Sequence, residues 1–112
     1  MNKKIVIIIV TYNIRENIIG CLDSLVAQTN QEFELFLIDN NSQDATIDVI
    51  TTYLAKHKDL QGKTEIVRND ANLGFAKAVN IGMRAALDKE DIYAVLLLNQ
   101  DVYFTSDLLE NA

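Results

Sequence analysis

Cysteine, proline and tryptophan are scarce or missing: the 112 residues include one cysteine and neither of the other two. Cys21 has no partner for an internal disulfide, which fits a reducing compartment, and we expect it as a small buried hydrophobe. A chain of this length can bury roughly two-thirds of its unfolded surface, so one layered core is feasible without cross-links. We therefore expect a single small domain over residues 1–112.

Basic residues and long hydrophobic runs are also in short supply. Ten Lys and Arg stand against sixteen Asp and Glu, which gives a net charge of -6. Such a chain lacks the basic surface that binds phosphate backbones, so we expect no nucleic-acid partner. The apolar run Ile5–Val10 is far shorter than the roughly 20 residues that cross a bilayer. We therefore expect no transmembrane segment in this chain.

The sequence does contain alternating strand-like and helix-like segments. Ile5–Val10 is β-branched and apolar on both faces, as in a central strand of a parallel sheet with helices on each side. Apolar residues at helical spacing then predict a helix from about Arg15 to Gln28. Similar patterns predict strands over 33–38, 64–67 and 93–98, and helices around 47–54 and over 75–87.

This order of segments predicts the fold class. Strands that alternate with helices form a mostly parallel sheet with right-handed crossovers, so we expect an α/β, three-layer, doubly wound fold. The polar stretch 56–63 is expected to be a simple connection. Thr105-Ser106-Asp107 is typical of a helix cap, and residues 108–112 are fewer than the about 11 of an average helix. We therefore expect this chain to be the N-terminal part of a longer protein.

Polar side chains collect where the predicted strands end. Thr11-Tyr12-Asn13 follow the first strand, Asp39 follows the second, and Asn99-Gln100-Asp101 follow the fourth. Doubly wound sheets bind ligands beyond the carboxyl ends of their strands, where the strand order reverses. Asn72 and Gly74 precede a helix whose amino terminus favours an anion. If the first and fourth strands are neighbours, we expect the three clusters at the strand ends to converge on one crevice.

Each of these clusters also has a structural explanation. Ser42 and Asp44 could cap the following helix, and Asn99-Gln100-Asp101 could be a turn. Gly74 could serve a tight turn. Asp39 differs, because a carboxylate that ends an apolar strand needs a hydrogen-bond donor or a cation.

Four blocks of sequence together resemble family 2 glycosyltransferases. They are Val10-Thr11-Tyr12-Asn13, residues 38–46, residues 72–76 with Asn80-Ile81-Gly82, and Leu98-Asn99-Gln100-Asp101-Val102. Each block is weak alone, but all four stand in the family's order and usual spacing. The resemblance implies a GT-A fold with strand order 3-2-1-4, a UDP- or dTDP-sugar donor, a divalent metal (Mg²⁺ or Mn²⁺) and inversion at the anomeric carbon. Rhamnosyltransferase-like members are the most similar.

The resemblance also implies roles for individual residues. Tyr12 would lie near the nucleotide base and Asp39 would hydrogen-bond a uracil or thymine ring. Asp101 would bind the metal that bridges the diphosphate. Asn99 departs from the family's Asp-x-Asp element and leaves one carboxylate fewer for that metal. The remaining residues expected around the donor are Thr11, Asn13, Asn72 and Gly74.

The resemblance therefore implies the donor-binding domain of an inverting glycosyltransferase that acts on a saccharide acceptor in polysaccharide biosynthesis. Inversion needs a carboxylate or histidine that takes the acceptor's proton, and no candidate for this catalytic residue emerges. In the family the base follows the Asp-x-Asp element, so we expect the 112-residue chain alone to be inactive. We expect a cytoplasmic protein, with the full-length protein possible at the inner face of the membrane.

Other nucleotide-binding classes lack their signatures here. No Gly-x-Gly-x-x-Gly follows the first strand, which argues against a dinucleotide-binding dehydrogenase. The acidic pair of a phosphate-accepting receiver and the Gly-rich loop of a nucleotidyltransferase are absent too. The alternative is a non-catalytic α/β domain, a fragment or degenerate transferase, that binds a nucleotide or a protein.

In the order 3-2-1-4 the strand 93–98 is an apolar edge without Lys or Pro, so we expect self-association.

Overall fold

A computed structural model describes residues 4–88, 92–98 and 109 of the chain. The elements in chain order are β1 Lys4–Thr11, α1 Ile18–Val26, β2 Phe33–Asp39, α2 Thr46–Lys56, α3 Lys58–Gln61, β3 Thr64–Arg68, α4 Phe75–Leu87 and β4 Ile92–Leu98. The four strands form one sheet in the order β3-β2-β1-β4, and every pair is parallel. The predicted doubly wound α/β fold and its strand order are confirmed.

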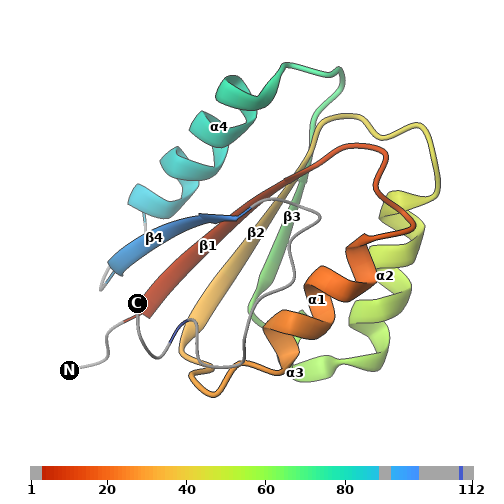
Figure 1. The fold of residues 1–112 in the computed structure, drawn as a ribbon. Coiled ribbons are helices and arrows are strands. Elements are labelled where there is room, and N and C mark those ends of the chain that lie inside the picture. Colours follow the sequence, from red (N-terminus) through yellow and green to blue (C-terminus); the bar gives the residue numbers. More distant parts are fainter. Residues whose placement is uncertain (1–3, 89–91, 99–108, 110–112) are drawn as a thin grey trace.

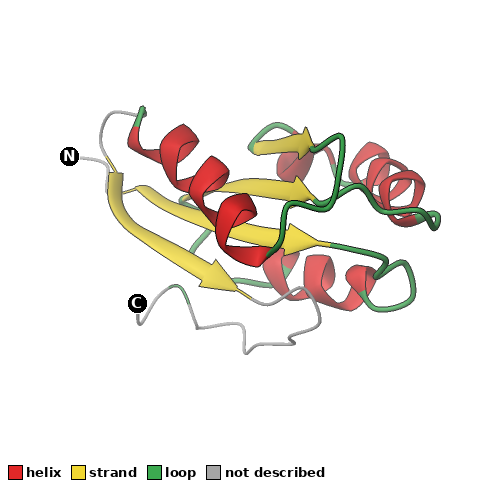
Figure 2. Ribbon diagram, turned by 90° about the horizontal axis from the view of Figure 1, so that it is seen from above, coloured by secondary structure: helices red, strands yellow, loops and turns green. Residues whose placement is uncertain are grey.

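The helices cover the sheet from both sides. Figures 1 and 2 show α4 alone on one face, while α1, α2 and α3 lie together on the other, so the fold has three layers. β1 and β2 are buried along almost their whole length, because both faces of these central strands are covered. This explains why their sequences are apolar runs rather than alternating patterns.

The face that packs on α1, α2 and α3 is built from large side chains. Leu22 and Leu25 of α1 and Ile50 of α2 are fully buried against the inward residues of β1 and β2. Leu109 joins this cluster and donates its backbone N–H to Gln28 Oε1 over 3.0 Å. This face holds most of the buried apolar volume of the described residues.

The face that packs on α4 uses small helix residues instead. Ala78, Gly82 and Ala86 are the buried positions of α4 and recur every four residues, so they form one stripe. A Cβ atom added at Gly82 would lie 2.8 Å from Ile8 Cγ2 of β1. Glycine fits here because any larger residue would require the Ile8 side chain or the helix to shift.

Two sequence predictions differ from the structure. The first helix begins at Ile18 rather than near Arg15, because the carbonyl of Ile14 accepts the N–H groups of Asn17 and Ile18 in a preceding turn. The stretch 56–63 is not a simple connection: it contains α3, which forms because Leu60 can bury its side chain in the core. The predicted cap at 105–107 lies outside the described residues.

Within the described part, no helix is long and apolar enough to span a membrane.

Candidate functional site

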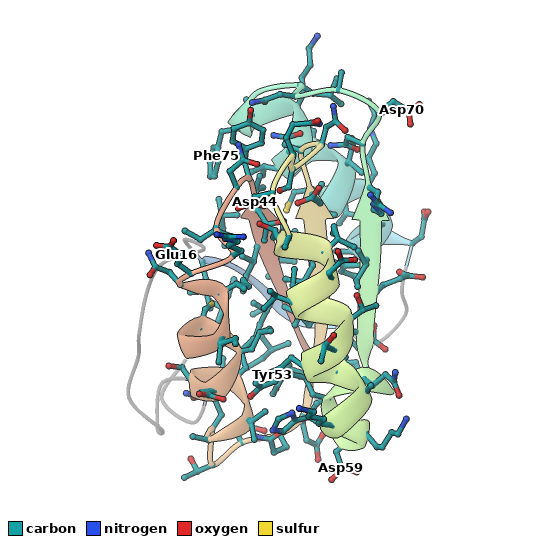
Figure 3. The ribbon with its side chains drawn as sticks, turned by 90° about the vertical axis from the view of Figure 1, so that its right-hand side faces the viewer. Glu16, Asp44, Tyr53, Asp59, Asp70 and Phe75 are labelled. Carbon is teal, nitrogen blue, oxygen red and sulfur yellow. The ribbon has the colours of Figure 1, made fainter. Side chains whose placement is uncertain are left out.

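The loops that follow β1, β2 and β3 meet at one end of the molecule. Parallel strands place their carboxyl ends at the same sheet edge, and the register sets Thr11 beside Asp39 and Asp39 beside Arg68. Figure 3 shows Asp44, Asp70 and Phe75, which come from three different segments, gathered toward this end. We call it the carboxyl edge.

Asp39 is the centre of a buried hydrogen-bond network at the carboxyl edge. Its side chain is 1% exposed, and its Oδ1 accepts hydrogen bonds from Thr11 Oγ1 over 2.8 Å and from Ser42 Oγ over 2.6 Å. Its Oδ2 accepts the backbone N–H of Ser42 over 2.9 Å. The expected donors for this strand-ending carboxylate are therefore present. An ionised carboxylate offers about four acceptor positions, so these three bonds leave about one on Oδ2.

Asn13 joins the loop after β1 to the loop after β2. Its backbone lies in the left-handed region with φ of 49°, which an asparagine tolerates better than most residues. Its N–H donates to Ser42 Oγ over 2.9 Å, and its Oδ1 accepts the N–H of Gln43 over 2.8 Å and that of Asp44 over 3.4 Å. Asn13 and Asp39 are thus linked through Ser42, and the two loops are held as one unit.

Asp44 fixes the start of α2 as well as the loop after β1. Its carboxylate accepts hydrogen bonds from the N–H and Oγ1 of Thr46 and from the N–H of Arg15, while Ile14 donates its N–H to Thr46 Oγ1. Burial alone would raise the pKa of Asp44, but the bonds from Thr46 and Arg15 outweigh it and lower the pKa. Asp44 thus bonds to Thr46, the first residue of α2, while Ala45 is the N-cap of that helix; Ser42 bonds to Asp39 and Asn13 instead.

The loop after β3 carries the remaining described residues of the predicted site. Asn72 Oδ1 accepts the N–H of Gly74 over 2.9 Å, and Gly74 is the N-cap of α4 with φ of 82°. That positive φ requires glycine, so the predicted turn role is confirmed. Asn40 reaches across from the end of β2, and its Nδ2 donates to the Gly74 carbonyl over 3.2 Å.

The carboxyl edge offers both apolar and polar surface to a ligand. Tyr12 and Leu73 are each 39% exposed, and Phe75 is 53% exposed at the start of α4. A hollow of about 270 Å³ is lined in part by Asn13, Arg15 and Asp44. Exposed aromatic side chains beside a helix amino terminus can contact a planar ring and an anionic group together.

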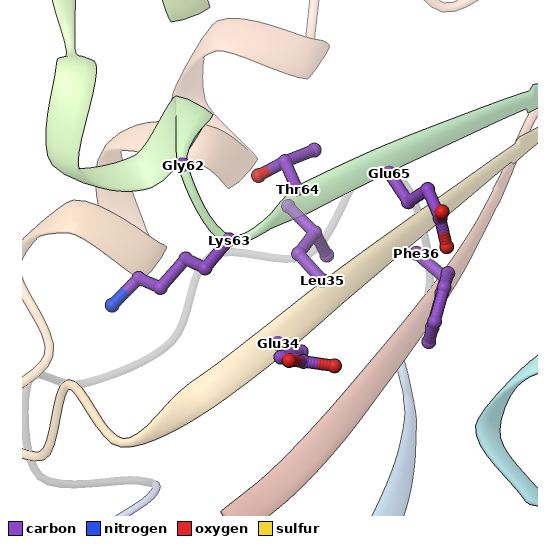
Figure 4. Close-up of a pocket in the computed structure, with 7 residues that line it drawn as sticks. All are labelled: Glu34, Leu35, Phe36, Gly62, Lys63, Thr64 and Glu65. Carbon is purple, nitrogen blue, oxygen red and sulfur yellow. The ribbon is translucent and has the colours of Figure 1, made fainter. Parts of the chain in front are cut away.

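Other hollows lie away from this edge. The pocket in Figure 4 has a volume of about 140 Å³ and is lined by Glu34, Lys63 and Glu65 among others. These residues stand at the amino-terminal ends of β2 and β3, at the opposite end of the sheet. Burial lowers the pKa of Lys63, partly offset by Asp59, and its Nζ donates to the Gln31 carbonyl over 2.7 Å. This lysine therefore has a structural role.

The structure brings together five of the predicted site residues, which are Thr11, Asn13, Asp39, Asn72 and Gly74, and it leaves Tyr12 exposed beside them. Asn99 and Asp101 lie outside the described residues. Among the residues that are described, no three His, Cys, Asp or Glu side chains form a group that could hold a metal ion. The predicted metal ligand therefore stays a prediction.

Two residues of this network were not among the predicted site residues. Ser42 connects Asp39 to Asn13, and Asn40 is 3% exposed and contacts the loop after β3. The available signal was a run of six polar residues, 39–44, directly after an apolar strand. Such a run exceeds what one turn needs, and its members face different loops.

Comparisons with known proteins identify a family and related sequences. The family model for "Glycosyl transferase family 2" matches residues 6–112. A PGL/p-HBAD biosynthesis glycosyltransferase of Mycobacterium bovis (strain BCG / Pasteur 1173P2) is 35% identical over 80 residues, which are 71% of this chain and 30% of that protein. The chain thus spans about a third of the length of this relative.

Solved structures share the fold. S. aureus TarS 1-349 in complex with UDP has a TM-score of 0.79 and 26% identity, over 96% of this chain and 30% of that one. The mannosyltransferase PcManGT from Pyrobaculum calidifontis, in complex with GDP-Man and Mn²⁺, has a TM-score of 0.82 and 24% identity, over 96% and 30% of the two chains. At 24% identity, the similarity to PcManGT concerns the fold alone.

Proposed function

The chain belongs to glycosyl transferase family 2, and we propose that its carboxyl edge binds the nucleoside diphosphate part of a nucleotide-sugar donor. The observation that carries this proposal is the meeting of three loops at the end of β1, β2 and β3, where Thr11, Asn13 and Asp39 form one hydrogen-bonded unit. That unit lies where doubly wound sheets bind ligands. TarS, which is similar to this chain, was solved with UDP and with UDP-GlcNAc.

The base would bind beside Tyr12 and Asp39. The exposed Tyr12 ring can stack on a planar base. The remaining acceptor position on Asp39 Oδ2 can take one N–H, such as the ring N–H of uracil or thymine. The diphosphate would then lie toward Asn72, Gly74 and the first turn of α4, where unpaired N–H groups and the helix dipole favour negative charge.

A divalent metal, Mg²⁺ or Mn²⁺, is part of the proposal through Asp101 and Asn99. When bound, such a metal neutralises the charge that develops on the departing diphosphate. A carboxylate and an amide oxygen are the hard ligands that these cations prefer. In this proposal the described residues hold the nucleotide at the carboxyl edge, where β4 also ends, and they are not themselves the metal ligands.

Titration of the 112-residue chain with UDP, dTDP and GDP tests the proposal. We expect saturable binding, tighter for UDP or dTDP than for GDP, and further tightened by Mn²⁺ or Mg²⁺. Asp101→Ala should abolish the gain from metal while leaving metal-free binding unchanged. No binding of any of the three nucleotides would refute the proposed site, and an unchanged metal effect in Asp101→Ala would remove that residue.

Asp39→Asn separates base recognition from folding. The amide can still accept, but its NH₂ group would face the donors Thr11 Oγ1 and Ser42 Oγ or N–H, so some loss of stability is expected. At a concentration of chain that is fully folded, the preference for UDP over GDP should disappear. Ser42→Ala is the matched control, because it disturbs the same network and leaves the carboxylate in place.

The activity of the whole protein is proposed from the family. We propose inverting transfer to a saccharide acceptor in polysaccharide biosynthesis, by a cytoplasmic protein or one at the inner face of the membrane. We also propose that the 112-residue chain transfers no sugar, since it covers 30% of the similar mycobacterial glycosyltransferase. Turnover of a donor onto a saccharide by the purified chain would contradict this. A nucleotide-binding chain whose full-length parent is inactive would favour the non-catalytic alternative.

Self-association of the 112-residue chain is proposed from β4. In the described part of the chain β4 pairs with β1 alone, and Leu97 on it is 45% exposed. An apolar edge strand without charges readily pairs with another strand. Sedimentation at micromolar concentration should detect a dimer or larger species, and Leu97→Lys should shift it toward monomer. A strictly monomeric wild-type chain would refute this proposal.

A further inference from the structure

Asn40 stands at the end of β2, between the loops that follow β1 and β3. Its backbone N–H donates to the Thr11 carbonyl over 2.9 Å, which extends the β1–β2 ladder by one residue. Its side chain is 3% exposed. A buried amide needs partners for its polar atoms, so the direction of its hydrogen bonds identifies the segment that it holds.

The side-chain hydrogen bonds of Asn40 go to the loop 69–74. Its Oδ1 accepts the Nδ2–H of Asn69 over 2.9 Å and the N–H of Leu73 over 3.4 Å. Its Nδ2 donates to the Gly74 carbonyl over 3.2 Å. Three of the four hydrogen-bond positions of the amide are therefore used, and they contact the first residue of the loop and its last two.

These contacts fix the place where α4 begins. The Gly74 carbonyl that accepts from Asn40 also accepts the N–H of Ala78 over 3.3 Å, which is the first hydrogen bond of α4. Asn40 thus ties the first turn of the helix to the end of β2. The neighbouring residue Asp39 bonds instead to Thr11 and Ser42, so the two consecutive side chains hold loops on opposite faces of the sheet.

We propose that Asn40 is a positioning residue of the donor site, which holds Asn72, Gly74 and the first turn of α4 at a fixed distance from Thr11 and Asp39. This inference rests on the proposed function, because it assigns the diphosphate to the α4 side of the crevice and the base to the Asp39 side. Only a side chain that both donates and accepts satisfies the three contacts. A carboxylate of the same shape would place an oxygen against the Gly74 carbonyl.

Asn40→Asp is the sharpest variant, because it keeps the shape of the side chain and removes the donor. The matched control is Asn41→Asp, which makes the same change of charge one residue away, at a side chain with no hydrogen bond to the loop 69–74. A general effect of negative charge on an anionic ligand would appear in both variants. An effect of the Asn40 contacts would appear in Asn40→Asp alone.

Two measurements are compared at a temperature where every variant is folded. Nucleotide affinity is measured with UDP and Mn²⁺, and amide hydrogen exchange is measured by NMR at Leu73, Gly74 and the first turn of α4. We expect about tenfold weaker UDP binding and faster exchange in this segment for Asn40→Asp, with exchange in β1 and β2 unchanged. For Asn41→Asp we expect both quantities to stay within about twofold of wild type.

Asn69→Ala provides a second route to the same contacts if Asn40→Asp does not fold. It removes the Nδ2–H donor from the loop side and should accelerate exchange in the same segment, with a smaller loss of affinity. Unchanged exchange at Leu73 and Gly74 in either folded variant would overturn the positioning role. Faster exchange with unchanged UDP affinity would overturn its connection to the donor site. If the wild-type chain binds no nucleotide, the proposed function fails, and exchange still decides whether Asn40 positions the loop.

Discussion

The two faces of the sheet are packed by different means. On one face α1 and α2 fill the space with long aliphatic side chains such as Leu22, Leu25 and Ile50. On the other face α4 presents Ala78, Gly82 and Ala86 and lies close to β1. The first face gains its stability from buried volume, whereas the second depends on a close fit between a helix backbone and a strand.

This difference bears on function because α4 begins at the candidate site. A helix held by large interlocking side chains can shift when one of them changes, whereas the distance of α4 from β1 is limited by direct contact between Gly82 and Ile8. Asn40 adds a hydrogen bond to the Gly74 carbonyl at the start of α4. The α4 face therefore favours precise placement, and the α1 and α2 face supplies most of the stability.

Removing volume from the α1 face should have the largest effect. Leu22 is fully buried, so Leu22→Ala loses its hydrophobic contacts and leaves a cavity, which should lower the free energy of unfolding by about 3 kcal/mol. Leu87 of α4 is 72% exposed, and Leu87→Ala is the matched control, with an expected change within about 0.5 kcal/mol. Urea unfolding measures both. Equal losses would contradict the assignment of the core.

Adding volume to the α4 face should have the next largest effect. A Cβ at Gly82 meets Ile8 Cγ2 at 2.8 Å, so Gly82→Ala forces the helix away from β1. The gain of about 1 kcal/mol in helix propensity is outweighed by overpacking, and we expect a net loss of about 1 kcal/mol. In Gly62→Ala the new Cβ lies 3.5 Å from its nearest neighbour, so this control should be neutral or stabilising. A stabilised Gly82→Ala would show that α4 has room to move.

Loss of a polar contact between α1 and α2 should have an effect no larger than that of Gly82→Ala, and this effect depends on pH. Tyr53 donates its hydroxyl to Asp23 Oδ1 over 2.6 Å, and burial, together with this bond and the Asp23 charge, raises the pKa of Tyr53. We expect Tyr53→Phe to cost about 1 kcal/mol at neutral pH.

The pH dependence of that cost has a definite sign. A phenol whose pKa is higher in the folded state stabilises the fold at pH values below its ordinary pKa of about 10. This contribution of Tyr53 is lost as the pH rises from about 10 toward the raised pKa. The difference in unfolding free energy between wild type and Tyr53→Phe should therefore shrink above pH 10. A difference that stays constant to high pH would show that the hydroxyl is not held by Asp23.

The sequence allowed the sheet to be predicted because its signal is local. Ile5–Val10 is apolar on both faces, and a strand of that kind must lie between helices. The cluster around Asp39 could be predicted as well, because a carboxylate after such a strand requires donors, which Thr11 and Ser42 supply. The residues of the site that lie at strand ends were therefore accessible to sequence reasoning.

The remaining contacts depend on how separate loops approach each other. The role of Asn40 could not be predicted, because its partners Asn69 and Gly74 are about thirty residues away and a polar residue in a turn usually bonds locally. α3 was missed for a similar reason. Four residues carry too little periodicity to identify a helix, and Leu60 becomes a core residue only once α2 has packed.

Because Asp39 and Asn40 are consecutive, the candidate site depends on the alternation of side chains between the two faces of the sheet. Each side chain serves a different face of the sheet, so their roles are set by odd and even position rather than by composition. An insertion of one residue between Ile38 and Asp39 would leave residues 33–38 of β2 in their present register with β1. It would nevertheless direct the carboxylate toward the α4 face of the sheet and the amide of the next residue toward the face that packs on α1 and α2. The number of residues between the buried part of β2 and Ser42 therefore decides which loop each of the two polar side chains can hold.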